Sequence, residues 1–391
     1  LAPREGFEPS TCPLGGGRAI QLRHRGESIE RCDQTSYPRV HVGANLIRSV
    51  HSLKRLMAVT STISRGSLDS VKAVFCEKLE GPDALVMREV AEPSPPGPNE
   101  IKVAIEARGV SFTDVLMSKG EYQVQPTLPF VIGGEGAGRV IEIGNDVNNI
   151  AVGDAVLVGA GCVEQVVVEA QRATVIPEGT DLESAASFRS NYVTAFYAMQ
   201  RGRLTPGETL LVHGAAGGVG LAAVDVGKLM GATVIATAGS DDKLAVVGEL
   251  GADHLINYSS GFRDEVKDLT GGKGADVIYD PVGGDVFDES MRCIAPFGRI
   301  LIVGFTGGRP ALAKTNHLLI KDAELIGFTI GGLARNDPVW ARRNQEVLMQ
   351  WLASGRIHPY ISHRLPLERT AEALNLITNR KVIGKAIIIN G

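Results

Sequence analysis

The stretch LVHGAAGGVGLAAVDVGKLMGATVIATAGSDDK, residues Leu211–Lys243, predicts a strand, a glycine turn, a helix and a second strand. The run TLLVHG that leads into the turn is short and aliphatic, as a buried parallel strand should be. A helix of small and aliphatic residues then ends near Gly231, and ATVIATAG forms the next strand. This order of elements favours an α/β fold with a doubly wound parallel sheet.

The glycine turn has the spacing of a pyrophosphate-binding loop. Gly214 permits a tight exit from the strand, while Gly217 and Gly218 let the backbone approach a phosphate. Gly220 allows the helix to pack closely on the strand, and Val219 lies between these positions. The motif alone would equally suit a plain βαβ unit. Because HLIN, DVIYD and GRILIVG follow as further strands, we expect a Rossmann-type dinucleotide site.

The second strand ends without the acid that usually binds an unphosphorylated ribose. Gly239 and Ser240 occupy that place, and Lys243 follows one helical turn later. A 2′-phosphate requires the carboxylate to be absent and cations to be near. Ser240 can donate its hydroxyl and Lys243 can supply charge, whereas Asp241 and Asp242 should cap the next helix and face water. The sequence therefore predicts NADPH as cofactor.

Composition restricts the classes of partner. The chain has 391 residues, a formal net charge of −4 and 44% hydrophobic residues, which gives no basic surplus for nucleic acid. No apolar run reaches the roughly 18 residues needed to cross a membrane. Five scattered cysteines without a C-x-x-C pair indicate a reducing, cytoplasmic setting. Cys76 and Cys293 lie in apolar runs and should pack in the core.

Residues 1–70 differ from the rest in composition. They are rich in Arg, Gly, Pro and Ser and show no helical or strand periodicity. A transit peptide would share the Arg and Ser content, but acids such as Glu5 and Glu8 argue against it. The segment resembles a translated transfer-RNA gene. We expect a disordered, non-native extension without function, with the natural start at Met57 or near Val71.

From Val71 onward the chain resembles the medium-chain dehydrogenase/reductase superfamily, and within it the zinc-independent NADPH:quinone oxidoreductases. The motifs that carry the resemblance are GGEGAGRV, GDAV, SNYVTAFYAM, HGAAGGVG and GRILIVGF, in this order. The resemblance implies a GroES-like β-barrel catalytic domain over residues 71–190 and 332–391. A Rossmann domain would span residues 191–331. It also implies a homodimer that pairs through a strand at Ala323–Gly331.

The resemblance also indicates which chemistry is available. Zinc-dependent members have Cys at the position of Ser111 and His at that of Gly134, next to Glu135. Catalytic zinc needs about three protein ligands, so we expect no metal. Hydride transfer to a quinone or similar conjugated carbonyl remains possible, because its negative charge is delocalised. The alternatives are an enone or enoyl-thioester reductase, or a non-catalytic NADPH-binding protein.

The resemblance assigns candidate roles to individual residues. Ser111 stands where zinc-free relatives have Asn beside the nicotinamide. Tyr122 matches a tyrosine of the substrate cleft and is the candidate donor to the acceptor oxygen, or else a half-buried barrel residue. Asp114 should cap a helix, as Asn191 would if it does not bind cofactor. Residues expected along the cofactor, besides the glycine turn, Ser240 and Lys243, are Asn191, Thr194, Tyr258, Gly304, Phe305 and Thr306.

Overall fold

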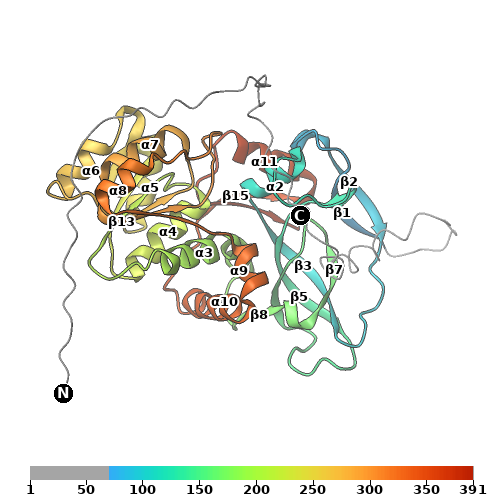
Figure 1. Cartoon of the computed structure of the whole chain (residues 1–391). Helices are drawn as coiled ribbons and strands as arrows, with labels where there is room; N and C mark the ends of the chain where they lie inside the picture. The colour runs from blue at the N-terminus through green and yellow to red at the C-terminus, as the bar shows by residue number, and fades with distance from the viewer. Residues whose placement is uncertain (1–69, 391) are drawn as a thin grey trace, which may run out of the picture. The chain divides into compact units, whose positions relative to one another are not determined.

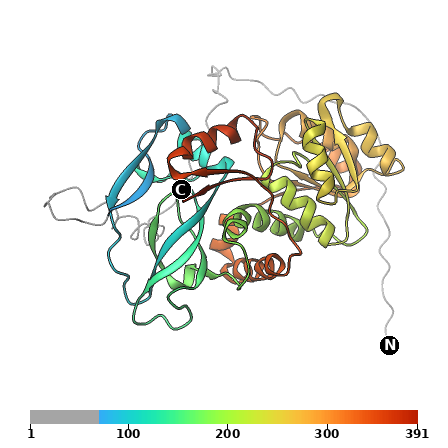
Figure 2. The same cartoon turned by 180° about the vertical axis from the view of Figure 1, so that it is seen from behind.

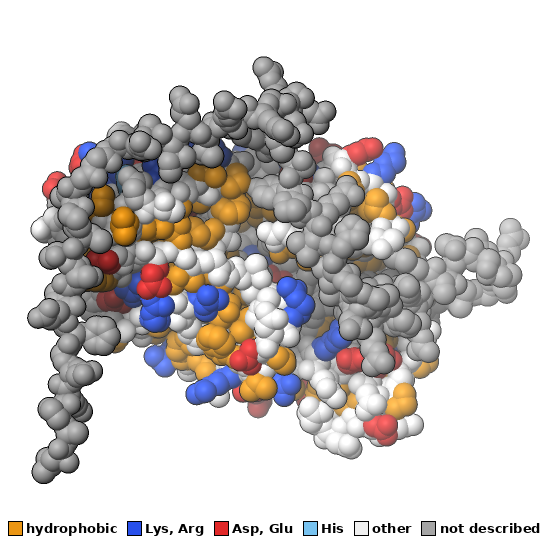
Figure 3. All heavy atoms as spheres, in the orientation of Figure 1, with side chains coloured by type: hydrophobic (Ala, Val, Ile, Leu, Met, Phe, Trp, Pro, Cys, Tyr) orange, Lys and Arg blue, Asp and Glu red, His pale blue; other side chains and the backbone are white. Residues whose placement is uncertain are grey.

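The computed structural model describes residues 70–390, so the predicted extension over residues 1–70 lies almost entirely outside the described part. The strands form three sheets. The largest has seven strands, the second has six and the third has three. Figure 1 shows the six-stranded sheet with its helices in green to orange, and strands β1 to β7 in blue to green. Figure 3 shows the same view as spheres, with hydrophobic and charged side chains interspersed on this face.

The six-stranded sheet is parallel throughout, in the order β11-β10-β9-β12-β13-β14. Its central strand β12 is buried at every position, as expected for a parallel strand covered on both faces. The strands are β9 Thr209–Val212, β10 Thr233–Ala238, β11 His254–Asn257, β12 Ala275–Asp280, β13 Ile294–Ile302 and β14 Glu324–Gly327. The connecting helices are α4 Gly218–Leu229, α5 Asp241–Glu249, α6 Arg263–Leu269, α7 Gly284–Cys293 and α8 Thr315–Lys321. This sheet confirms the predicted doubly wound fold.

The seven-stranded sheet combines segments from the two ends of the described chain. Its last strand, β16, runs antiparallel to β3, with Ala386 opposite Val110, which confirms that the C-terminal strand returns to the first part of the chain. Its strands are β3 Glu100–Val110, β5 Glu135–Ile143, β6 Ala155–Val158, β7 Gln165–Glu169, β8 Thr174–Val175, β15 Ile361–Pro366 and β16 Lys385–Ile389. The three-stranded sheet consists of β1 Ser70–Cys76, β2 Leu85–Ala91 and β4 Phe130–Val131.

A long helix, α3, joins the two larger sheets. Residues of α3 share one hydrophobic core with Leu157 of the seven-stranded sheet and Val212 of the six-stranded sheet. Figure 2, seen from behind, shows α3 beside α4 and the strands of the seven-stranded sheet. The remaining helices are α2 Phe112–Lys119, α3 Leu182–Arg201, α9 Ile330–Asn336, α10 Pro338–Ala353 and α11 Thr370–Thr378. The 3₁₀ turns are η2 Pro82–Ala84, η3 Ala170–Arg172, η4 Tyr258–Ser260 and η5 Leu367–Arg369.

One predicted element is shorter than expected. The strand predicted over Ala323–Gly331 ends at Gly327, and α9 begins at Ile330. Thr329 causes this change of direction, because its side chain caps α9 by accepting a hydrogen bond from the backbone N–H of Gly332. The cap overrides the strand preference of the alternating aliphatic residues.

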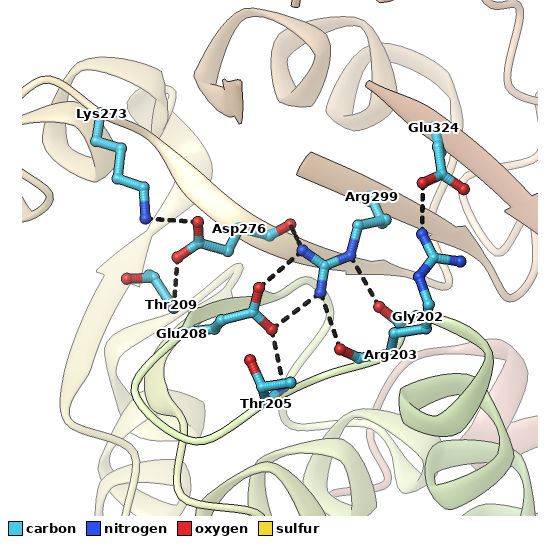
Figure 4. Close-up of polar contacts among 9 residues, drawn as sticks. All are labelled: Gly202, Arg203, Thr205, Glu208, Thr209, Lys273, Asp276, Arg299 and Glu324. Carbon is cyan, nitrogen blue, oxygen red and sulfur yellow. Dashed lines mark hydrogen bonds and ion pairs between the residues drawn. The ribbon is translucent and has the colours of Figure 1, made fainter. Parts of the chain in front are cut away.

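A buried arginine holds the amino-terminal edge of the six-stranded sheet together (Figure 4). The Arg299 guanidinium binds both carboxylate oxygens of Glu208, at 2.8 and 2.9 Å, and donates to the carbonyls of Gly202 and Arg203. These bonds fix the end of α3 to β13, on the side of the sheet away from the glycine turn. Cys76 and Cys293 are buried, as predicted. Between residues 70 and 390 no helix is long and apolar enough to cross a membrane.

Candidate cofactor and acceptor site

The glycine turn connects β9 to α4 with almost no room for side chains. Gly214 has a φ of 55°, in the left-handed region that favours glycine. A Cβ on Gly220 would lie 2.3 Å from the carbonyl oxygen of Gly214. A Cβ on Gly218 would lie 2.5 Å from the Asn191 amide nitrogen. The first N–H groups of α4, which begins at Gly218, have no acceptor within the helix, and the positive end of the helix dipole lies behind them, which suits a phosphate.

Two residues predicted to contact the cofactor lie on α3 beside this turn. Asn191 is buried, and its amide group packs against Gly218. It sits in the middle of α3, so the interpretation of Asn191 as a helix cap is wrong. The N-cap is Asp181, whose carboxylate accepts from the backbone N–H of Ser184. Thr194 donates its hydroxyl to the Ser190 carbonyl at 2.6 Å, a bond within the helix.

The end of β10 carries the polar and basic residues that the sequence predicted, Ser240 and Lys243. A further basic residue, Arg380, was not predicted. Ser240 is the N-cap of α5. The Lys243 ammonium donates to the Arg380 carbonyl at 2.7 Å, which brings a second basic residue to this end. A Cβ on Gly239 would lie 3.6 Å from the Tyr258 hydroxyl, so that ring covers the strand end.

Arg380 was missed because 137 residues separate it from Lys243 in the chain. Its backbone has a φ of 57°, in the left-handed region, and it ends the turn after α11. Its guanidinium reaches the Thr306 carbonyl at 3.4 Å. Arg380 thus connects the end of β10 with the loop after β13, which is where Gly304, Phe305 and Thr306 were predicted to face the nicotinamide.

The loop after β13 is hydrogen-bonded to Pro281, the residue that follows β12. Both the backbone N–H and the hydroxyl of Thr306 donate to the Pro281 carbonyl at 3.0 Å. Gly304 is also close, since a Cβ there would lie 3.5 Å from the same carbonyl oxygen. Phe305 is exposed at the carboxyl edge of the sheet, the edge where ligands bind in folds of this kind.

Ser111 and Asp114 form a reciprocal capping box at the start of α2. The Asp114 carboxylate accepts from the Ser111 backbone N–H at 2.7 Å and from its hydroxyl at 3.0 Å, which confirms the predicted cap. Burial raises the pKa of Asp114 to about 6, although the nearby Lys385 ammonium opposes the shift. Burial also raises the pKa of Tyr122, and the charge of Asp114 adds to this effect.

A buried ion pair lies next to this cap, and its lysine was also missed from the sequence. Lys385 and Glu135 are 3% and 4% exposed, and the ammonium contacts the Glu135 carboxylate directly. Ser190 donates its backbone N–H and its hydroxyl to the same carboxylate, each at 2.8 Å. The lysine also donates to the Ser190 hydroxyl at 2.9 Å. Three segments, from β5, α3 and β16, meet at this cluster.

These residues do not fit a zinc ion. Glu135, the one potential ligand that matches the zinc-dependent pattern, is engaged by an ammonium and by Ser190. Within residues 70–390 no group of three or more His, Cys, Asp and Glu side chains is arranged to hold a metal.

His213, which precedes the glycine turn, is part of the core. Its two ring nitrogens pair with the hydroxyls of Thr237 and Ser290, at 2.9 and 2.8 Å. Burial lowers its pKa to about 3, so the ring is neutral. His213 therefore has a structural role.

Comparison with known proteins places the chain in a family. Residues 97–195 match the alcohol dehydrogenase GroES-like domain, and residues 218–352 match the zinc-binding dehydrogenase model. Quinone oxidoreductase-like protein 2 of Mus musculus is 39% identical over 323 residues, which cover 81% of this chain and 91% of that protein.

Solved structures agree with this placement. Escherichia coli quinone oxidoreductase complexed with NADPH superposes with a TM-score of 0.75 at 29% identity, over 81% of this chain and 99% of that one. Pseudomonas syringae quinone oxidoreductase gives a TM-score of 0.74 at 31% identity, over 82% and 99% of the two chains. The chain therefore belongs to the medium-chain dehydrogenase/reductase superfamily, among its quinone oxidoreductase-like members.

Proposed function

We propose that this protein is an NADPH-dependent reductase that transfers hydride to a quinone or a related conjugated carbonyl without a metal. The observation that carries the proposal is the end of β10, where Lys243 donates to the Arg380 carbonyl and the strand ends in Gly239 and Ser240 without an acid. The next acid, Asp241, accepts a hydrogen bond from the Asn257 side chain at 2.7 Å. Relatives named quinone oxidoreductase, one of them complexed with NADPH, support it.

The residues divide into two groups along the cofactor. The N-terminus of α4 would hold the pyrophosphate, because the first N–H groups of a helix have no acceptor within it and Gly217 and Gly218 place no side chain in front of them. Lys243 and Arg380 would pair with the 2′-phosphate, and Ser240 would donate a hydroxyl to it. When bound, the cofactor supplies the hydride. The chain orients it and excludes water from the reacting atoms.

Tyr122 is the candidate donor to the acceptor oxygen. Its pKa is raised by burial, so the hydroxyl keeps its proton at neutral pH and can donate a hydrogen bond. Ser111 is a weaker candidate because its hydroxyl already donates to Asp114. Tyr122→Phe should therefore lower kcat more than Ser111→Ala does.

The experiment is NADPH consumption measured against a panel of quinones, enones and enoyl-thioesters. Turnover of quinones supports the proposal. Turnover of enones or enoyl-thioesters alone would favour the alternative reductase, and NADPH binding without turnover of any acceptor would favour a non-catalytic role.

We further propose that the protein is a homodimer paired through β14. This strand lies at the edge of the six-stranded sheet, with its outer hydrogen-bonding side unpaired within the described chain. The adjacent helix α8 exposes Leu319 and Ile320, which are 79% and 75% accessible. Bare strand edges next to apolar side chains favour pairing with another chain.

A further inference from the structure

A cavity of about 340 Å³ lies between α3, α9 and α10, three helices that pack on one another (Figure 1). This volume is at the small end of the roughly 300–1,000 Å³ that is usual for small-molecule sites. Its lining is Tyr197, Arg201, Phe328, Thr329, Gly332, Leu333, Asn336, Asp337 and Trp340. We call it the aromatic pocket.

The aromatic pocket is separate from the cofactor and acceptor site. None of the residues assigned to the cofactor, to the acceptor oxygen or to the Glu135 ion pair is among those that line it. Its Arg201 wall is the last residue of α3, and the carbonyl of the next residue, Gly202, accepts a hydrogen bond from Arg299 at 2.8 Å. That end of α3 lies on the side of the sheet away from the glycine turn. A molecule in this pocket would therefore bind in addition to the cofactor and the acceptor.

The walls of the pocket suit a flat ring. The Tyr197 ring meets Phe328 edge to face, with centroids 5.6 Å apart and an interplanar angle of 86°. It meets Trp340 in the same way, at 5.2 Å and 85°. The Trp340 indole N–H donates to the Gln200 side chain at 3.1 Å, which fixes the orientation of that ring. Rigid aromatic walls favour stacked or edge-to-face contact with another π-system.

One wall carries a positive charge that is not neutralised. The Arg201 guanidinium lies 5.9 Å from the Tyr197 ring centroid and makes one long hydrogen bond, of 3.4 Å, to its hydroxyl. In the part of the chain that the structure describes, no carboxylate pairs with Arg201 and the Asn336 amide makes no hydrogen bond. Asp337 also lines the pocket, but it caps α10 by accepting from the backbone N–H of Trp340. Most of the five N–H donors of Arg201 thus remain available to an anionic oxygen.

We propose that the aromatic pocket is a second ligand site, and that it binds a small aromatic acid. The ring of the acid packs against Tyr197, Phe328 and Trp340. Its carboxylate or sulfonate accepts hydrogen bonds from Arg201, whose planar fork matches two oxygens of such a group, and from the Asn336 amide. The acid is bound and not converted. The site does not depend on the proposed function, because no residue of the pocket takes part in hydride transfer.

Fluorescence quenching tests this site. The chain has two tryptophans, so Trp351→Phe leaves Trp340 of the pocket as the single fluorophore. The probes are 4-nitrobenzenesulfonate and the neutral 4-nitrobenzenesulfonamide, because a nitroaromatic ring quenches a nearby indole and the two probes differ chiefly in charge. The sulfonate should quench Trp340 saturably, and adding Arg201→Gln should weaken its binding about tenfold, as expected for the loss of a charge-assisted contact. Binding of the sulfonamide should change less than about twofold.

Two controls test the chemistry of the ligand. Arg343→Gln, at an exposed arginine of α10 outside the lining, should leave the binding of both probes unchanged. Inorganic phosphate should compete weakly, because it has no ring to contact the aromatic walls. An equal loss for both probes in Arg201→Gln, or phosphate binding as tight as that of the sulfonate, would overturn the assignment of an aromatic acid. Absence of saturable quenching in Trp351→Phe would overturn it as well.

Saturating NADP⁺ tests whether the pocket is a separate site. NADP⁺ cannot reduce the nitro group, and it should leave the dissociation constant of the sulfonate unchanged. Competition between NADP⁺ and the sulfonate would place the probe in the cofactor site and overturn the proposal. Quenching of Trp340 by the sulfonate in a protein that reduces no quinone would leave the second site in place while overturning the proposed function.

Discussion

Replacing Asp114 by Asn should stabilise the protein, and by more at high pH than at low pH. Asn keeps an oxygen that can accept the Ser111 backbone N–H, so the cap of α2 survives. The substitution removes the carboxylate of Asp114, a residue that is 3% exposed. Burial raises its pKa from 3.8 to about 6. The folded state therefore holds the proton more tightly than the unfolded state does, and ionisation above that pKa opposes folding.

The magnitude follows from these two pKa values. A shift of about 2 units corresponds to about 3 kcal/mol, which is the full cost of the ionised Asp114 at pH 8. At pH 4.5 the folded state is protonated while the unfolded state is mostly ionised, and the cost is about 1 kcal/mol. The free energy of unfolding of Asp114→Asn, relative to wild type, should thus increase by about 2 kcal/mol between pH 4.5 and pH 8.

Urea denaturation of both proteins at several pH values measures this difference. Asp181→Asn is the control, because it exchanges carboxylate for amide at the exposed cap of α3. Its effect on stability should stay within about 1 kcal/mol. A stability difference between Asp114→Asn and wild type that is independent of pH, or that shrinks as the pH rises, would refute the account of a carboxyl destabilised by burial.

Two further predictions concern the six-stranded sheet. Arg299→Met should lower the free energy of unfolding by about 3–5 kcal/mol, because Glu208 and two carbonyls lose their partner. Arg203→Met removes an exposed ion pair with Glu324 and should lower it by less than about 1 kcal/mol. Equal losses in urea denaturation would contradict this reading of Figure 4. The protein should sediment as a dimer, and Leu319→Lys should shift it toward monomer. A wild type that is monomeric at every concentration would exclude pairing through β14.

The pattern of the sequence predicted those parts of the site that are local in the chain. The glycine turn and the Asp114 cap each lie within a few residues, so spacing alone reveals them. The cap of α5 was assigned to Asp241 and Asp242, whereas its N-cap is Ser240, one residue earlier. Helical and strand periodicity also identified the parallel sheet. The prediction of a strand over Ala323–Gly331 was too long, because Thr329 caps helix α9 where the alternating aliphatic residues suggested that the strand continues.

The remainder of the site depends on contacts between distant segments. Lys385 reaches Glu135 across 250 residues, and Arg380 reaches Lys243 across 137. No periodicity links such positions, and a lysine or arginine near the end of a chain usually faces solvent. The contacts of the Tyr197 ring with Phe328 and Trp340 were missed for the same reason, since these rings come together only when α3 packs on α9 and α10.

The central claim is that a phosphorylated ribose binds at the end of β10. The measurement that tests it most directly is kcat/KM for NADPH against NADH, with one quinone held constant, in the wild type and in Lys243→Ala. The wild type should prefer NADPH by about tenfold or more, and Lys243→Ala should lower only the NADPH value, by a factor equivalent to about 1–2 kcal/mol. A wild type that uses NADH as well as or better than NADPH would contradict the claim.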